Sequence, residues 1–402
     1  FCQIHSRIPM TNCLKLFLGT SVAFRIISQN RGTTTSAFCL AHPKSYPRRS
    51  TLFSSLGKPS KNGHEILYSE EVTFALEAVR KACVITKKLQ DKLNTITTLQ
   101  KDDSSPVTVA DFASQAVILQ HLNEHFQNDL FLAEESSDNL TSHVSKQILN
   151  ACESSKIKDE ITLKSCIDLG KKFYRKNTGS HRVWCLDPID GTKGFLRGEQ
   201  YCVALALLED GIPTIGILAC PNLPFTDGSG SSSVGCIFVA CKGKGCFQLD
   251  LEELSNRPPK RLDSSSAALR DPSTARFCVG VEQGFADPVG KCKEMAEHLH
   301  GRLADDGSGE ILYAVRMDSQ AKYGVVARGD AEFYVRLPKP EHRDWIWDVA
   351  PGVLVLEEAG GVVSDANGKP LDFSVGAKLT SNGILGARSR LQHEALLNAY
   401  QK

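Results

Sequence analysis

The pattern of hydrophobic and polar residues predicts two helices early in the acidic part of the chain. Between residues 69 and 92, apolar side chains recur with the spacing of an amphipathic helix. Ser69 suits its N-cap, because two glutamates follow in the first turn. A second amphipathic stretch runs from residue 109 to about residue 126 and begins beside Asp111. We therefore expect Asp111 at the start of a helix.

Two short apolar runs predict buried strands. Residues 130–133 and 183–186 are apolar, and each run ends abruptly in carboxylates. We expect these carboxylates to share one rim, since buried strands present their carboxyl ends to a site. The charged stretch between the runs, residues 136–181, has weak periodicity and is interpreted as a surface excursion without chemistry.

The middle of the chain predicts an antiparallel strand pair. Residues 202–221 contain two apolar runs on either side of Asp210 and Gly211, a dipeptide that favours a type I′ hairpin. Residues 256–273 are rich in proline and serine and suggest a connection between domains. Strands and helices alternate beyond it: strands are expected at 277–281, 323–327 and 331–336, and helices at 290–300 and from Asp348 onward.

These elements predict an α/β protein with two structured parts. A chain of 402 residues exceeds a single ordinary core. We expect an α+β metal-binding domain at residues 65–262 and an α/β domain at residues 263–402. With 41% hydrophobic and 23% charged residues, the composition is that of a folded enzyme and not of a fibrous or disordered chain.

The charge distribution sets the first 64 residues apart. They contain nine Lys or Arg and no Asp or Glu, so the remaining residues carry 38 basic against 46 acidic side chains, a formal charge of −8. Such a body is not expected to bind a nucleic-acid polymer. The basic segment is rich in Ser and Thr, which predicts a disordered transit peptide for a chloroplast or mitochondrion. A disordered basic tail on a cytoplasmic protein is the alternative.

The same segment is not expected to enter a membrane. Its apolar patch at residues 14–27 is interrupted by Lys15 and Arg25 and is shorter than a membrane span requires. The chain's 14 cysteines are scattered without a CxxC pair, which argues against zinc. Cys236, Cys241 and Cys246 are interpreted as buried or hairpin thiols, with redox pairing as the alternative.

Acidic residues at predicted element ends are the candidate chemistry. They occur in SPVTVADFASQ, LAEESSD, WCLDPIDGT and WIWDVAPG: Asp111, Glu134, Asp187, Asp190 and Asp348. Carboxylates gathered at one cleft are hard oxygen ligands for Mg²⁺. Each motif also has a plainer interpretation, since Asp111 and Asp348 suit helix N-caps, paired glutamates are usually solvated, and DPIDGT suits a Pro/Gly turn.

The DPIDGT motif would bring two carboxylates together. Asp187 and Asp190 flank a proline that restricts the turn, with the Ile189 carbonyl between them. Gly191 and Thr192 follow at an expected helix start, where backbone N–H groups can hold phosphate oxygens. Two Mg²⁺ ions would offset about four negative charges and could clamp both oxygens of an in-line phosphoryl displacement.

Three of these motifs resemble the signatures of the inositol monophosphatase superfamily of lithium-sensitive, magnesium-dependent phosphatases. They are AEES, LDPIDGT and WDVAPGVLVLEEAGG, and the resemblance covers about residues 70–400. It implies a layered αβαβα sandwich and two or three Mg²⁺ ions. It also implies metal-binding roles for Glu134, Asp187, the Ile189 carbonyl, Asp190 and Asp348, with Asp111 near a further metal.

Four stretches are similar to the branch of this superfamily that hydrolyses 3′-phosphoadenosine 5′-phosphate to AMP: SPVTVADFASQ, WCLDPIDGTKGFLRGEQYCVALALLEDG, MDSQAKYGVVARGDAEFYVRLP and IWDVAPG. The resemblance implies that Asp111 and Thr192 activate water and that the substrate contacts Gly191, Thr192, Ser319, Lys322, Arg336 and Asp348. Lys322 and Arg336 match positions that face the 5′-phosphate. Many relatives have histidines shortly after a GVE segment, where this chain has Phe285, Ala286 and Asp287. Phe285 could stack on the base or belong to the core.

The sequence thus predicts a monomeric phosphatase acting on a small bisphosphorylated nucleotide, or on its 5′-phosphosulfate analogue. An inositol phosphate phosphatase with the same metal site is the alternative within this class. A nucleotide-binding sensor without turnover is the alternative outside it, but an intact set of carboxylates has no evident use in nucleotide binding alone.

Overall fold

The computed structural model describes residues 16–18, 21–23, 69–93, 98–100, 106–171, 182–226, 232–252, 257–264, 270–281, 290–301, 314–381 and 383–402. The chain divides into two compact units, Phe1–Leu56 and Gly57–Lys402. In the first unit, the described residues form one antiparallel hairpin, β1 (Leu16–Leu18) with β2 (Ser21–Ala23). The sequence predicts no regular element there. The rest of the predicted transit peptide lies outside the described residues.

Two long helices open the second unit. They are α2 (Ser69–Gln90) and α3 (Val109–His125), which confirms both predicted helices to within two residues. A short hairpin, β3 (Thr98–Gln100) with β4 (Pro106–Thr108), precedes α3. Thr108 and Asp111 form a capping box at the start of α3. The Thr108 side chain accepts a hydrogen bond from the backbone of Asp111, and the Asp111 side chain accepts one from the backbone of Thr108. The fold therefore fixes the Asp111 side chain by a local hydrogen-bond pattern.

A seven-stranded sheet packs beneath these helices. Its strands follow the order β11-β10-β9-β8-β7-β6-β5, and only the edge pair β5·β6 is parallel. Asp210 and Gly211 both have positive φ, 53° and 77°, which confirms the predicted type I′ hairpin between β7 and β8. The strand bounds are β5 (Leu130–Ala133), β6 (Arg182–Asp190), β7 (Cys202–Glu209), β8 (Ile212–Thr226), β9 (Ser232–Cys241), β10 (Gly245–Asp250) and β11 (Lys260–Leu262).

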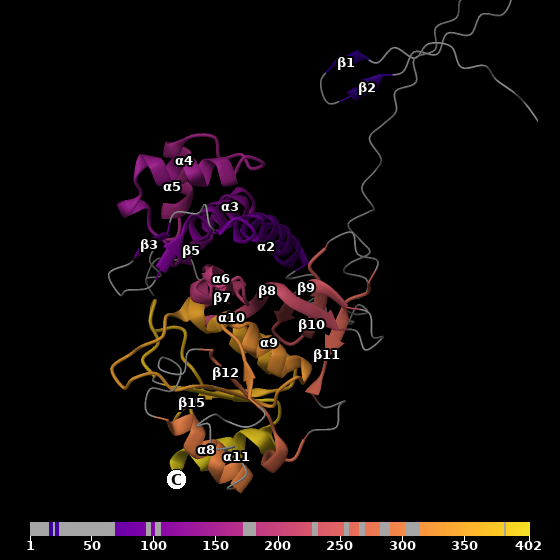
Figure 1. The fold of residues 1–402 in the computed structure, drawn as a ribbon, viewed down its shortest axis with the longest axis vertical. Coiled ribbons are helices and arrows are strands. Elements are labelled where there is room, and N and C mark those ends of the chain that lie inside the picture. The colour runs from indigo at the N-terminus through magenta and orange to yellow at the C-terminus, as the bar shows by residue number, and fades with distance from the viewer. Residues whose placement is uncertain are drawn as a thin grey trace, which may run out of the picture. The chain divides into compact units, whose positions relative to one another are not determined.

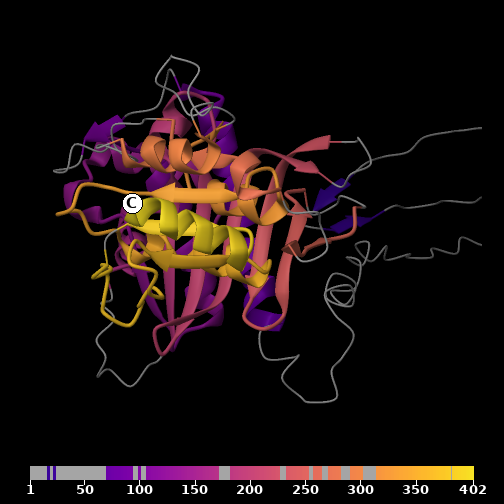
Figure 2. The same ribbon diagram turned by 90° about the horizontal axis from the view of Figure 1, so that it is seen from below.

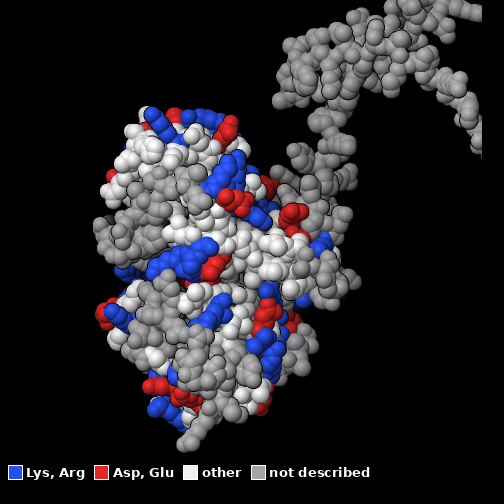
Figure 3. All heavy atoms as spheres, viewed as in Figure 1, with Lys and Arg blue, Asp and Glu red and all other residues white. Residues whose placement is uncertain are grey.

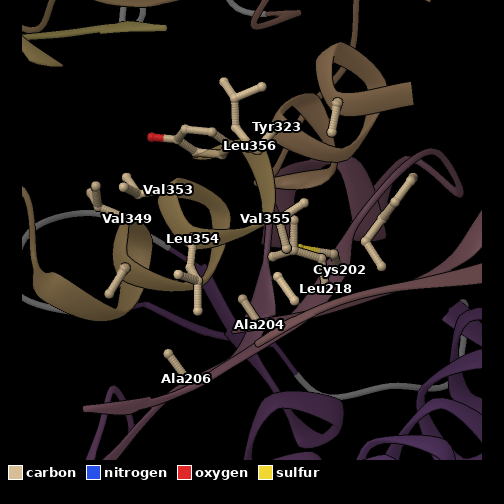
Figure 4. Close-up of a cluster of buried hydrophobic side chains, with 14 of the residues drawn as sticks. Cys202, Ala204, Ala206, Leu218, Tyr323, Val349, Val353, Leu354, Val355 and Leu356 are labelled. Atoms are coloured by element: carbon tan, nitrogen blue, oxygen red, sulfur yellow. The ribbon is translucent and has the colours of Figure 1, made fainter. Parts of the chain in front are cut away.

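Helices α9 (Ala321–Arg328) and α10 (Ala350–Glu358) cover the other face of this sheet. Figure 4 shows apolar side chains of α10 directed at small residues of β7, such as Ala204 and Ala206. Two glycines let the helices approach closely. A Cβ on Gly324 would lie 2.3 Å from Phe238, and one on Gly352 would lie 2.1 Å from Tyr323. A larger residue at Gly324 would push α9 away from the sheet, and one at Gly352 would push α10 away from α9.

A five-stranded sheet forms the next layer. Its order is β13-β12-β14-β16-β15, with β13 (Val315–Arg316), β12 (Phe277–Val279), β14 (Phe333–Arg336), β16 (Ile384–Ala387) and β15 (Val362–Asp365). Helices α8 (Lys291–His300) and α11 (Arg390–Gln401) close its outer face, as Figure 2 shows. The second unit is therefore the predicted αβαβα sandwich (Figure 1).

Two sequence-based expectations are wrong. The stretch 136–181 contains two helices, α4 (Ser142–Ala151) and α5 (Glu160–Asp168), which pack on α3. Residues 323–327 belong to α9 and not to a strand, because a short apolar run cannot distinguish a strand from a helix that is buried on all sides. The predicted connection at 256–273 includes the strand β11, which pairs with β10, and its role as a link between domains stays a prediction.

The predicted domain division remains a prediction. The two sheets lie on either side of the predicted boundary, but α9 and α10 pack between them within one compact unit. None of the described helices has the length and apolar character needed to cross a bilayer. On the face seen in Figure 3, basic side chains of described residues stand in short groups beside acidic ones and form no extended basic stripe.

Three cysteines are confirmed as strand thiols. Cys236 and Cys241 lie on β9, and Cys246 lies on β10 opposite Ala240. All three are free, and burial raises the pKa of each thiol. A thiol held in its protonated form is a poor nucleophile, which favours a packing role over redox pairing.

Candidate active site

The DPIDGT motif forms the end of β6 and breaks its pairing with β7. The register is regular up to Asp187, which lies opposite Ala204, and shifts before Asp190, which lies opposite Cys202. The Asp187 carboxylate accepts a hydrogen bond from the backbone N–H of Ile189 at 3.1 Å. Ser114 on α3 donates to the Pro188 carbonyl at 2.9 Å. The bulge therefore turns both carboxylates out of the strand, and α3 holds it in place.

Gly191 and Thr192 carry the chain from this bulge into the short helix α6 (Thr192–Leu196). Gly191 has a φ of 88°, and a Cβ there would lie 3.1 Å from the Cβ of Ser319. This position therefore requires glycine. The Thr192 hydroxyl donates to the Ile189 carbonyl at 3.2 Å and lies 3.5 Å from Asp111 Oδ1. The predicted pair of Asp111 and Thr192 is thus brought together across 81 positions of sequence.

Asp111 is the third residue of α3 and not its N-cap, which is Thr108. Its Oδ2 accepts hydrogen bonds from the Thr108 backbone N–H at 2.8 Å and from the Thr108 hydroxyl at 2.7 Å, as a capping residue does. Its Oδ1 faces Thr192. The side chain is 1% exposed. One oxygen holds the helix start while the other is directed to the site.

Glu134 follows β5, the strand beside β6. Its backbone N–H donates to the Leu186 carbonyl at 3.3 Å, which continues the parallel pairing into the site. The next residue, Glu135, is locked by Gln115 of α3, whose side chain accepts from the Glu135 N–H at 2.9 Å and donates to its carbonyl at 2.7 Å. Gln115 is fully buried and was not singled out from the sequence. It fixes the loop that carries Glu134.

Asp348 ends a 3-10 turn, η7 (Ile346–Asp348), immediately before α10. It lies beside the start of α10, as predicted, but it is not the N-cap. That residue is Val349, which makes no side-chain capping hydrogen bond. Arg336 Nη2 lies 4.0 Å from Asp348 Oδ2. The Asp348 side chain is 24% exposed, so it faces a partly open space and not the core.

The carboxylates gather into one electrostatic cluster. Burial raises the pKa of Asp187 well above its usual range, and its three acidic neighbours raise it further. Burial likewise raises the pKa of Asp190 and of Asp348, and the negative charge of Glu134 adds to both shifts. Every pair within the cluster interacts in this way, so the following side chains share one region of space: Glu134, Asp187, Asp190 and Asp348.

The donor set fits a hard divalent cation. Neighbouring carboxylates that oppose one another's ionisation in a partly enclosed site need a counter-charge to stay ionised, and oxygen ligands are those that Mg²⁺ prefers. The Ile189 carbonyl lies between two of them in the bulge. Across the described ranges, no three Asp, Glu, His or Cys side chains already stand at ligand spacing around one point. The cluster therefore supplies the charge and the ligand type for a divalent cation.

Two basic side chains border the cluster, as the sequence predicts. Lys322 on α9 is 9% exposed and donates to the Ser319 carbonyl at 2.8 Å. Burial lowers the pKa of its ammonium group, while the negative charge of Asp190 acts in the opposite direction. Lys322 and Arg336 also act to lower the pKa of Asp190. The cations thus lie beside the carboxylates and belong to the same site.

Arg336 is held by a residue that the sequence did not reveal. Its Nε and Nη2 contact Asp344 Oδ1 at 2.8 Å and 2.6 Å. Burial opposes the charge of Arg336, but Asp344 overrides this effect and keeps the pKa of the guanidinium above its usual value. The positions of Phe285, Ala286 and Asp287 lie outside the described residues.

Comparison with known proteins places this site in a known family. The model of the inositol monophosphatase family matches residues 68–402. A protein named 3′(2′),5′-bisphosphate nucleotidase from Dictyostelium discoideum is 38% identical over 336 residues, which cover 82% of this chain and 96% of that protein. One of the same name from Schizosaccharomyces pombe is 39% identical over 340 residues, which cover 80% of this chain and 92% of the relative.

A solved structure supports the same architecture. The extragenic suppressor protein suhB from Bartonella henselae superimposes with a TM-score of 0.55 at 19% identity, covering 83% of this chain and 99% of that protein. At this level of identity the likeness concerns the fold alone. It confirms the layered α/β arrangement that the sequence predicts.

Proposed function

The chain belongs to the inositol monophosphatase family, and we propose that it hydrolyses the 3′-phosphate of 3′-phosphoadenosine 5′-phosphate to give AMP and phosphate. The single observation that carries this proposal is the pair of cations, Lys322 and Arg336, beside the carboxylate cluster. When one phosphate lies at the cluster, the positive charge of Lys322 and Arg336 would offset the charge of a second phosphate on the same substrate. Inositol monophosphate has no such second group.

The carboxylate cluster and the Ile189 carbonyl would hold two or three Mg²⁺ ions. When bound, the ions supply charge neutralisation for a phosphoryl group that reacts very slowly by itself. Phosphate contacts by Gly191 and Thr192 remain a prediction, since α6 has only five residues and adds little dipole. Ser319 is 6% exposed, and its carbonyl holds Lys322, so it contributes to the site at least through that lysine.

Asp111 and Thr192 would deliver the water. The Thr192 hydroxyl can pass its proton to Asp111 Oδ1 while it accepts a proton from an attacking water molecule. Asp111 keeps its second oxygen on Thr108, so the accepting oxygen stays oriented. Water attacks directly in this scheme, and no covalent intermediate forms.

The test compares substrates with and without Mg²⁺. We expect phosphate release from the bisphosphorylated nucleotide, and from its 5′-phosphosulfate analogue, to exceed that from inositol monophosphate and to require Mg²⁺. Faster release from inositol monophosphate would instead favour an inositol phosphate phosphatase. No release from any substrate, with nucleotide binding retained, would favour a sensor.

Asp187→Asn is the decisive variant. It removes a charge from the centre of the cluster, and we expect Mg²⁺-dependent release to fall by at least about 10³-fold. Asp365→Asn is the matched control, because Asp365 is also a buried carboxylate but accepts hydrogen bonds only from its own turn, from the N–H groups of Asn367 and Lys369. Equal activity losses in the two variants would contradict the ligand assignment.

We also propose that the enzyme is a monomer and that residues 1–64 direct it to a chloroplast or mitochondrion. The basic, acid-free composition of this segment supports the second proposal. A fluorescent reporter carrying these residues after an added Met should enter an organelle, and a cytoplasmic reporter would contradict it. Light scattering that gives the mass of two chains would contradict the monomer.

A further inference from the structure

Ser319 occupies a backbone conformation that side-chain-bearing residues rarely adopt. Its φ is 72°, one of two positive values among the described non-glycine residues, and the residue is 6% exposed. The other positive value belongs to a hairpin turn that requires it, whereas Ser319 precedes a helix. Such strain persists where surrounding contacts impose it, and it often marks a functional position.

The turn at Ser319 directs the next backbone N–H to a member of the carboxylate cluster. The Gln320 N–H donates to Asp190 Oδ2 at 2.5 Å. This hydrogen bond lowers the pKa of Asp190 against the effect of burial, so it favours the ionised carboxylate. The start of α9 therefore holds one oxygen of Asp190 in place.

The side chain of Gln320 spans a second junction. Its Nε2 donates to the Trp347 carbonyl at 2.8 Å, and its Oε1 accepts from the Gly352 N–H at 3.1 Å. These groups lie on either side of Asp348, in the turn and in the first turn of α10. Because α10 has no side-chain cap from its own N-cap residue, the Gly352 N–H would otherwise be an unpaired buried donor. Gln320 caps this helix from a different element.

Three segments thus meet at one residue that is 2% exposed. Gln320 contacts the bulge that carries Asp190 and the turn that carries Asp348, and it lies on the helix start that carries Lys322. We propose that Gln320 is a positioning residue that fixes the spacing between the cation-binding carboxylates and the two basic side chains. This inference rests on the proposed function, because it assigns a purpose to that spacing.

A purely structural role is the competing explanation. A buried glutamine with every polar atom satisfied stabilises any fold, and its loss leaves orphaned backbone groups. The two explanations differ in what else changes. A structural residue alters stability alone, whereas a positioning residue also alters the affinity of the cluster for divalent cations and the recognition of the second phosphate.

The test uses Gln320→Met, which preserves the volume of the side chain and removes both of its hydrogen bonds. Gln392→Met is the matched control. Gln392 is 1% exposed and donates to the Arg270 carbonyl at 2.8 Å, at the start of a different helix, α11. Three quantities are measured on the full chain: the melting temperature, Mn²⁺ binding followed by electron paramagnetic resonance, and kcat and KM for the bisphosphorylated nucleotide.

We expect both variants to melt at lower temperature. Gln320→Met alone should weaken Mn²⁺ binding, by about tenfold for the loss of two hydrogen bonds that orient ligand segments, and should raise KM. Unchanged Mn²⁺ affinity in a folded Gln320→Met protein would overturn the proposal. Gln320→Glu, which keeps the acceptor for Gly352, replaces Gln320→Met if that variant does not fold. Failure of both to fold, with a folded Gln392→Met protein, would assign Gln320 a structural role only.

The Mn²⁺ readout separates this inference from the proposed function. If the wild-type protein releases no phosphate from any bisphosphorylated nucleotide, the proposed function fails. The Mn²⁺ affinities of the variants then still decide whether Gln320 positions the carboxylates.

Discussion

Replacing Asp344 with Asn should impair recognition of the second phosphate. Asp344 is not a candidate ligand, and no motif marks it, but it is the partner that holds Arg336 through Nε and Nη2. His342 Nε2 lies 3.3 Å from the same carboxylate oxygen. Asparagine keeps the shape of the side chain and removes its charge. Arg336 would then lose the charged partner that orients its guanidinium and keep only a weaker, neutral acceptor.

The structure sets the size of the effect. Burial alone would raise the pKa of Asp344, but the Arg336 guanidinium and His342 override it and lower the pKa to about 2. Measured from the ordinary value of 3.8, this shift corresponds to about 2.5 kcal/mol. The Asp344 side chain is 2% exposed, so solvent screening removes little of it. We expect the free energy of unfolding to fall by about 2–4 kcal/mol, because the guanidinium stays buried without its counter-charge.

A pair of substrates isolates the role in recognition. 3′-Phosphoadenosine 5′-phosphate and adenosine 3′-phosphate present the same phosphate to the carboxylates and differ only in the second phosphate. For Asp344→Asn we expect kcat/KM to fall by about 10- to 100-fold on the bisphosphate. On the monophosphate it should change by less than about threefold, since Arg336 has no phosphate to bind there. The change on the bisphosphate should appear mainly in KM.

Asp129→Asn is the control. Asp129 is also a buried carboxylate that grips an arginine through Nε and Nη2, at 2.9 Å and 3.2 Å, but its partner Arg182 begins β6 at the end opposite the site. It should lower stability without changing the ratio of kcat/KM between the two substrates. Equal losses on both substrates in Asp344→Asn, or a matching change of ratio in Asp129→Asn, would refute the reasoning.

Two further predictions concern single groups. Thr192→Val removes the hydroxyl that faces Asp111, so kcat should fall by about 10²-fold or more while Mn²⁺ affinity is unchanged. Thr192→Ser keeps the hydroxyl, and its kcat should stay within about threefold of the wild-type value. Equal kcat values for the two variants would contradict the proton path. Burial and then Lys81 lower the pKa of His121 to about 4, so the unfolded state binds the extra proton between pH 6.5 and 4 and stability falls as the pH drops through that window. The measurement is the free energy of unfolding by denaturant at pH 4.5 and at pH 7. Its change with pH should be smaller in His121→Gln than in the exposed control His143→Gln, by up to about 1.4 kcal/mol per pH unit. Equal changes in the two variants would contradict the prediction.

The parts of the fold that sequence predicts well are those set by local patterns. The helices α2 and α3 have the expected bounds because their apolar spacing extends over many turns. The Asp210–Gly211 turn follows from the dipeptide itself. By contrast, residues 323–327 form a helix because two sheets bury α9 on both sides, a condition that a five-residue apolar run does not encode.

The same distinction explains which site residues the sequence reveals. Carboxylates at element ends stand out because a strand or helix stops beside them, and the structure does bring the four together. Gln115, Gln320 and Asp344 act through contacts that no spacing specifies. Gln320 reaches Asp190 across 130 positions, and its role depends on the Gly352 N–H lacking a cap of its own. The residues that supply charge can therefore be predicted from the sequence. The residues that fix the distance between charges can be identified only from the packed structure. Substitutions of the residues that fix these distances should alter cation affinity and substrate specificity while the carboxylate ligands themselves stay intact.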